Sequence, residues 1–144
     1  INLRTPALLP DAYCPDVHER LTLYKRLANC ESVDELDALQ EELIDRFGQL
    51  PLQGQSLLAT HRLRLLVQPL CVQKLDASAD QITLQFGPEF AKLAPIDPIR
   101  IINLIQKNRS YKLSGQDKIS LLRHCPTLND KVAAVKDMIR QLSQ

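Results

Sequence analysis

The stretch EELIDRFGQLP, residues 41–51, decides how this chain of 144 residues is interpreted. It has the pattern of the last turns of an acidic amphipathic helix. Phe47 closes the apolar side, Gly48 can adopt the left-handed conformation that ends a helix, and Pro51 prevents the helix from continuing. The sequence therefore predicts a helix that stops at Phe47.

The start of this helix is marked as clearly as its end. Ser32 and Glu35 form the Ser-x-x-Glu pattern of a capping box, in which each side chain bonds a free backbone N–H of the first turn. Apolar residues then recur every three or four positions and predict one buried face: Val33, Leu36, Leu39, Leu43 and Phe47.

The rest of the helix surface is acidic. Residues 31–45 hold seven acidic side chains and no basic one: Glu31, Asp34, Glu35, Asp37, Glu41, Glu42 and Asp45. Because the whole chain has 17 acidic and 18 basic side chains, the net charge of +1 combines an acidic helix of −7 with a remainder of +8. Such a separation predicts attraction between the helix and a basic surface.

Glu41, Glu42 and Asp45 are the best candidate site residues. They lie in the last turns of the helix, where an acid opposes the helix dipole by about 0.3–1 kcal/mol, and Arg46 follows Glu42 at i+4. Their one-sided placement favours an interaction face for arginine or lysine of a partner. A solvated helix face is the alternative, and a metal-binding or catalytic carboxylate pair is less well supported because no histidine accompanies it.

Spacing along the rest of the chain predicts an α+β fold of about five helices packed on a small antiparallel sheet. Helical spacing and caps predict four further helices, at about residues 16–29, 55–66, 97–107 and from 127 onward. In the first of these, the predicted apolar set is Val17, Leu21, Tyr24, Leu27 and Ala28. Alternating residues predict two hairpins, with strands at 72–75, 82–86, 111–113 and 119–121 and the second turn at 114–117.

The chain is expected to form a single domain over residues 1–144. It would consist of an extended leader at 1–15, a helical part at 16–70 and a mixed part of hairpins and helices at 71–144. Because it opens on Ile1 and not Met, with an extended stretch directly after it, we expect a fragment of a longer protein. The sequence contains neither a signal peptide nor an apolar run long enough to span a membrane, and its four cysteines are widely spaced, which favours the cytoplasm.

Three strings in the first part of the chain resemble one known family. They are TPALLP at residues 5–10, RLxxYKRLA at 20–28 and ELIDRFGxLP at 42–51, where x marks a position that does not count toward the resemblance. As a set they resemble the C-terminal domain of bacterial transcription-repair coupling factors. Gln49 departs from the more apolar residue expected at that position.

The resemblance implies a function for the parent protein and for this part of it. The parent would be an ATP-dependent DNA translocase that removes stalled RNA polymerase and recruits the UvrA excision-repair subunit. ATP and DNA would bind the parent's motor domains, which are not in this chain. The domain itself would dock on an N-terminal UvrB-like module and mask the surface that binds UvrA. By motif, Glu42, Asp45 and Arg46 would carry this docking, with Glu41 beside them.

The chain is therefore expected to be a regulatory interaction domain and not an enzyme, with no cofactor, metal or membrane contact of its own. Phosphate-binding loops and hydrolase motifs are absent from the sequence. An accessory DNA-binding module that uses the basic C-terminal half is the second hypothesis. A hydrolase that uses Glu42 and Asp45 is the third.

Overall fold

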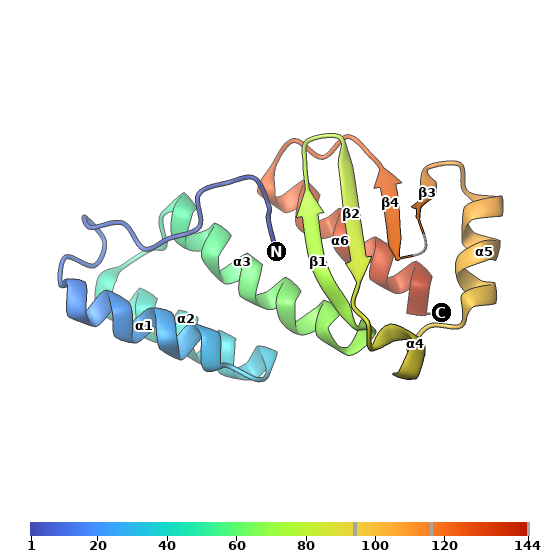
Figure 1. Cartoon of the computed structure of the whole chain (residues 1–144). Coiled ribbons are helices and arrows are strands. Elements are labelled where there is room, and N and C mark those ends of the chain that lie inside the picture. Colours follow the sequence, from blue (N-terminus) through green and yellow to red (C-terminus); the bar gives the residue numbers. More distant parts are fainter. Residues whose placement is uncertain (94, 116, 144) are drawn as a thin grey trace. The chain divides into compact units, whose positions relative to one another are not determined.

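The structure is a computed structural model that describes residues 1–93, 95–115 and 117–143 (Figure 1). Within them lie six α-helices, one short 3-10 helix and four strands, which confirms the predicted α+β class. The helices are α1 (Val17–Asn29), α2 (Val33–Phe47), α3 (Leu52–Val67), η1 (Gln68–Leu70), α4 (Phe90–Leu93), α5 (Pro98–Lys107) and α6 (Leu128–Ser143). The strands are β1 (Val72–Ala77), β2 (Gln81–Phe86), β3 (Tyr111–Ser114) and β4 (Lys118–Leu122).

The chain divides into two compact units. The helical unit is Thr5–Leu65, and the sheet unit is Ile1–Arg4 with Leu66–Gln144. The helical unit has ten acidic and six basic side chains, a net charge of −4, whereas the sheet unit has seven acidic and twelve basic ones, a net charge of +5. The single domain expected from the sequence stays a prediction.

The helical unit packs α1, α2 and part of α3 around a leucine core. Leu36, Leu39 and Leu43 of α2 are buried as predicted, and Phe47 packs against them half-buried. Val33, predicted to lie on the same buried face, is 39% exposed at the first turn of the helix. The leader also enters this core, because Leu9 and Cys14 are buried in it. Unlike a solvated extended segment, the leader thus covers part of the apolar surface of the helices.

The predicted apolar face of α1 is wrong in part. Leu27 is buried and Tyr24 packs against the core, but Val17 and Leu21 are 59% and 54% exposed, and Ala28 is exposed as well. Leu23, which the sequence analysis left out, is buried in their place. The core contacts the side of α1 that carries Leu23 and Leu27. The spacing of Val17 and Leu21 alone does not reveal which side of the helix is buried.

In the sheet unit the two predicted hairpins form one antiparallel sheet in the order β1-β2-β4-β3. β2 and β4 pair at its centre, with Leu84 opposite Ile119. Alternate residues point to one apolar face, which α6 covers with Ala134, Val135, Met138 and Leu142 (Figure 1). Gln116, in the predicted second turn, lies outside the described residues.

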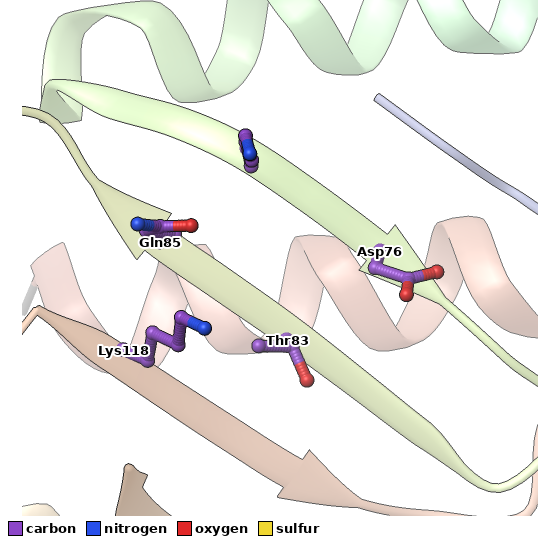
Figure 2. Close-up of a pocket in the computed structure, with 5 residues that line it drawn as sticks. Asp76, Thr83, Gln85 and Lys118 are labelled. Carbon is purple, nitrogen blue, oxygen red and sulfur yellow. The ribbon is translucent and has the colours of Figure 1, made fainter. Parts of the chain in front are cut away.

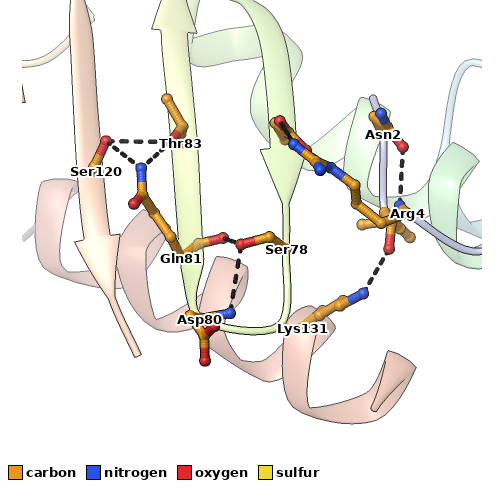
Figure 3. A network of polar contacts seen from close by, with 10 residues as sticks. Asn2, Arg4, Ser78, Asp80, Gln81, Thr83, Ser120 and Lys131 are labelled. Carbon is orange, nitrogen blue, oxygen red and sulfur yellow. Dashed lines mark hydrogen bonds and ion pairs between the residues drawn. The ribbon is translucent and has the colours of Figure 1, made fainter. Parts of the chain in front are cut away.

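The first four residues of the chain extend the sheet unit at its β1 edge. Asn2 pairs with Asp76 in the parallel direction: its N–H donates to the Leu75 carbonyl at 2.8 Å, and its carbonyl accepts from Ala77 at the same distance. Lys131, only 4% exposed, donates from Nζ to the carbonyl of Leu3 at 2.7 Å (Figure 3). This pairing was not predicted from the sequence.

One helix boundary differs from the sequence prediction, and two short helices were not predicted. α3 begins at Leu52, three residues before the predicted start, because Gly54 lies inside the helix. A Cβ at Gly54 would lie 3.2 Å from Leu50 Cδ2, so glycine allows close packing there and does not break the helix. The short helices α4 and η1 were not predicted, since four or fewer residues give no periodic pattern.

Candidate functional site

The C-terminal end of α2 is fixed by the residues that the sequence identified. The N–H of Gly48 donates to the carbonyl of Ile44 at 2.9 Å, and Gly48 has φ 91° and ψ −167°. The positive φ confirms that glycine ends the helix. Its ψ, however, is extended, so the conformation is not the left-handed helical one that we predicted.

The N-terminal end of α2 has half of the predicted capping box. The Ser32 hydroxyl accepts from the N–H of Glu35 at 3.2 Å. The Glu35 carboxylate accepts a hydrogen bond from the N–H of Glu31 at 2.7 Å, and not from the N–H of Ser32 as the capping box requires. Both ends of the acidic helix are therefore held by hydrogen bonds to its own sequence neighbours.

A tyrosine from the leader braces the same end of α2 as Gly48. The Tyr13 hydroxyl lies 2.8 Å from the carbonyl of Gly48 and 3.1 Å from that of Leu43, and its ring centroid is 5.5 Å from that of Phe47. Burial raises the pKa of Tyr13. Sequence reasoning missed this residue because nothing in the leader's spacing links it to a helix 30 residues further on.

Glu42 is paired with an arginine from a different helix. Arg26, in the last turn of α1, donates from Nη1 to Oε2 at 2.6 Å and from Nη2 to Oε1 at 2.8 Å, which is a bidentate arrangement. This hydrogen-bonded pair lowers the pKa of Glu42 and raises the pKa of Arg26. The sequence showed no link between the two residues, because they are 16 positions apart.

Arg46 completes a network of four alternating charges. Its Nη1 lies 3.3 Å from Glu42 Oε2, which is the i,i+4 pair seen in the sequence. Its Nη2 pairs with Glu19 of α1, and its guanidinium carbon lies 4.9 Å from the centroid of the Phe47 ring. We call Glu19, Arg26, Glu42 and Arg46 the α1–α2 ion-pair network; its net charge is zero.

The predicted site residues therefore fall into two groups. Glu42 and Arg46 belong to the network, with side chains 35% and 41% exposed. Glu41 and Asp45 lie on the exposed side of α2 and form no ion pair with any residue that the structure describes. A cation that approaches α2 from solvent thus finds Glu41 and Asp45 unpaired.

The opposite flank of α2 is neutralised by α3. Arg62 pairs with Asp37 and donates to Gln40 Oε1 at 2.6 Å. Arg64 lies 3.4 Å and 3.3 Å from the carbonyls of Leu27 and Cys30, where it bonds the C-terminal end of α1. The arginines on the polar side of α3 thus hold the helical unit together and do not form an open basic patch.

The environment of Glu42 disfavours the hydrolase hypothesis. A carboxyl group acts as a general acid when its pKa is raised, whereas Arg26 lowers the pKa of Glu42. Over the described ranges, no group of three or more acidic, histidine or cysteine side chains is placed to hold a metal ion. The lowered pKa therefore argues against Glu42 as a general acid.

The outer face of the sheet is polar and carries a shallow hollow of about 260 Å³. Figure 2 shows Asp76, Thr83, Gln85 and Lys118 on this face, and Lys74 completes the lining. Arg4 holds Asp76 in a bidentate pair at 2.9 and 2.7 Å, which lowers the pKa of Asp76. Among the described residues that line the hollow, none is an aromatic side chain on which a base could stack. Among the helices described, none is long and apolar enough to cross a membrane.

A family model described as the TRCF domain matches residues 3–95, which include α1, α2 and α3. The chain is 42% identical over 144 residues to the transcription-repair-coupling factor of Haemophilus influenzae and 34% identical over 145 residues to that of Escherichia coli. These matches cover 99% and 100% of this chain but only 12% of each relative.

The fold also matches a solved structure. The crystal structure of the C-terminal domain of a transcription-repair coupling factor superposes with a TM-score of 0.78 and 22% sequence identity. The match covers 98% of this chain and 89% of that chain.

Proposed function

This chain belongs to the TRCF domain family of transcription-repair coupling factors, and from that premise we propose that it is a regulatory interaction domain. It docks, within its parent protein, on an N-terminal UvrB-like module and covers the surface that recruits UvrA. Because the chain spans 12% of its curated relatives, the parent's ATP-driven translocation on DNA, its contact with RNA polymerase and its place in the cytoplasm are part of the proposal.

The observation that carries the proposal is the arrangement of charge at the end of α2. Glu41 and Asp45 are exposed and unpaired among the described residues, and Arg46 is held beside them by Glu19 and Glu42. A fixed pattern of two anions and one cation favours a partner with the complementary pattern and disfavours other charged surfaces.

The energetics suit a mask that has to open. Exposed ion pairs contribute about 0.2–1 kcal/mol each, and salt screens them. A tether in the same chain supplies an effective concentration on the order of millimolar, so weak contacts are enough to keep the mask closed. A partner that separates this chain from the UvrB-like module can then expose the UvrA-binding surface.

The proposal is tested in the full-length parent protein by its affinity for UvrA. Alanine at Glu42, Asp45 and Arg46 together should unmask the surface and raise that affinity. The control variant, alanine at Glu89, Asp117 and Arg109, removes the same charges from exposed positions of the sheet unit and should leave UvrA binding unchanged. An equal affinity for UvrA in the wild type and the first variant would contradict the masking role.

The net charge of +5 on the sheet unit supports a second candidate, the accessory DNA-binding module. Lys74 and Lys118 lie on the sheet's outer face, each paired across the strands with Gln85. If this face bound duplex DNA, affinity would fall steeply with salt, and replacing both lysines by glutamine would flatten that dependence. No binding to duplex DNA at low salt would remove this candidate.

A further inference from the structure

The α1–α2 ion-pair network leaves Glu42 little capacity for a partner. An ionised carboxylate has about four acceptor positions. Two are taken by Arg26 and a third by the weaker contact with Arg46. An incoming arginine therefore cannot form a bidentate pair with Glu42 while Arg26 stays in place.

Arg26 is nevertheless exchangeable. Its side chain is 46% exposed, and that of Glu42 is 35% exposed, so water can reach both partners as the pair opens. Exposed pairs of this kind contribute little to the stability of a fold. The fold of the helical unit is secured independently by the buried leucines of α1 and α2, so the pair can open without unfolding either helix.

We infer that Arg26 is an internal competitor that occupies Glu42 in the undocked chain and is displaced when an arginine-bearing partner docks on α2. The inference rests on the proposed function and adds a specificity-determining residue from α1. Glu41 and Asp45, unpaired within the described part of the chain, make the first contact. Glu42 joins only after Arg26 leaves, so Arg26 lowers the docking affinity and helps the mask to open.

Arg26→Gln should then tighten the binding of a basic ligand by roughly two- to fivefold. This factor corresponds to the free energy that one exposed ion pair contributes. Removing any positive charge near α2 also helps a cation to bind. Lys25→Gln is therefore the matched control, because Lys25 is the exposed neighbour of Arg26 on α1 and forms no ion pair with a described residue. Arg26→Lys, which keeps the charge but loses the bidentate geometry, should give a smaller gain than Arg26→Gln.

The experiment is an NMR titration of the labelled whole chain with a hexa-arginine peptide at low salt, repeated in the Glu42→Gln background. We expect Arg26→Gln to bind more tightly than Lys25→Gln, and this difference to vanish when Glu42 is replaced. The pKa of the Glu42 carboxyl, followed in the same samples, should rise in Arg26→Gln because its main hydrogen-bond partner is lost.

Equal affinities for Arg26→Gln and Lys25→Gln, or no perturbation of Glu42 by the peptide, would overturn the inference. The separated UvrB-like module is titrated in parallel. If the module fails to bind while the peptide still distinguishes the two variants, the proposed function fails and the competition by Arg26 stands. Unfolding midpoints of every variant, measured alongside, show that both helices remain folded.

Discussion

At the scale of single residues, neighbouring acids on one helix have different roles because their surroundings differ. Glu42 faces α1, and both of its carboxylate oxygens accept hydrogen bonds from Arg26. Asp45, less than one turn away, is exposed. The first residue organises the surface and positions Arg46, and the second is available to a partner. A motif that contains both residues therefore does not identify which one makes the contact.

His61 gives a prediction for pH. It is half-buried in α3, and burial, followed by the charge of Arg64, lowers its pKa. The imidazole therefore takes up a proton more readily in the unfolded chain than in the folded one. Because of this, the free energy of unfolding is highest above about pH 6.5 and falls as the pH drops below that value. Urea unfolding at pH 7.5 and 5.5 should show this loss, and His61→Gln should reduce it. The exposed His124→Gln is the control; a loss that is identical in all three proteins contradicts the assignment.

Lys131 gives a prediction for the N-terminal pairing. Lys131→Met leaves the carbonyl of Leu3 without its donor in a buried position, which should lower the free energy of unfolding by about 1–3 kcal/mol. Amide hydrogen exchange should also become faster in Ala77, whose N–H donates to Asn2. Lys136→Met, at an exposed position of the same helix, should change neither quantity. Unchanged exchange at Ala77 in Lys131→Met would show that Leu3 is held by other contacts.

At the scale of elements, the boundaries that could be predicted are those with a local chemical signal. Asp16, Ser32 and Asp97 each accept an N–H of the helix that follows, so the starts of α1, α2 and α5 were found from sequence. Elements that depend on tertiary contacts were not. The buried side of α1 and the bridge between Asn2 and Asp76 are set by residues distant in the chain.

Gly48 gives a prediction for the end of α2. Its φ of 91° with an extended ψ is almost restricted to glycine, so Gly48→Ala should cost about 1–3 kcal/mol. The cost comes from the backbone alone, since a Cβ there would meet nothing within 4 Å. Gly87→Ala is the control, because its Cβ would make ordinary contacts at 3.5 Å. Equal unfolding midpoints for the two variants in urea would contradict the strain at Gly48.

At the scale of the whole molecule, the chain combines two units of opposite charge. The acidic helical unit carries the candidate docking surface, and the basic sheet unit carries the polar outer face of the sheet. The sequence revealed the charge separation and the two hairpins. It could not reveal the order of the strands or the division into units, because both depend on pairings between distant segments.

Docking through surface charges predicts a strong dependence on salt. Raising the salt concentration from about 0.01 M to 0.15 M shortens the Debye length from about 30 Å to about 8 Å. The affinity of the chain for the separated UvrB-like module should fall several-fold over this range, and calorimetry or NMR can follow it. An affinity that does not change with salt would indicate an apolar interface, for which the exposed Val17 and Leu21 of α1 are the first residues to replace.

The most direct test of the docking role is an NMR titration of the labelled chain with the separated UvrB-like module at high concentration and low salt. The account predicts shifts centred on residues 41–48 that vanish when Glu42, Asp45 and Arg46 are replaced by alanine. The same shifts should persist when Glu89, Asp117 and Arg109 are replaced. The absence of shifts, or shifts confined to the basic sheet unit, would contradict docking through the acidic helix.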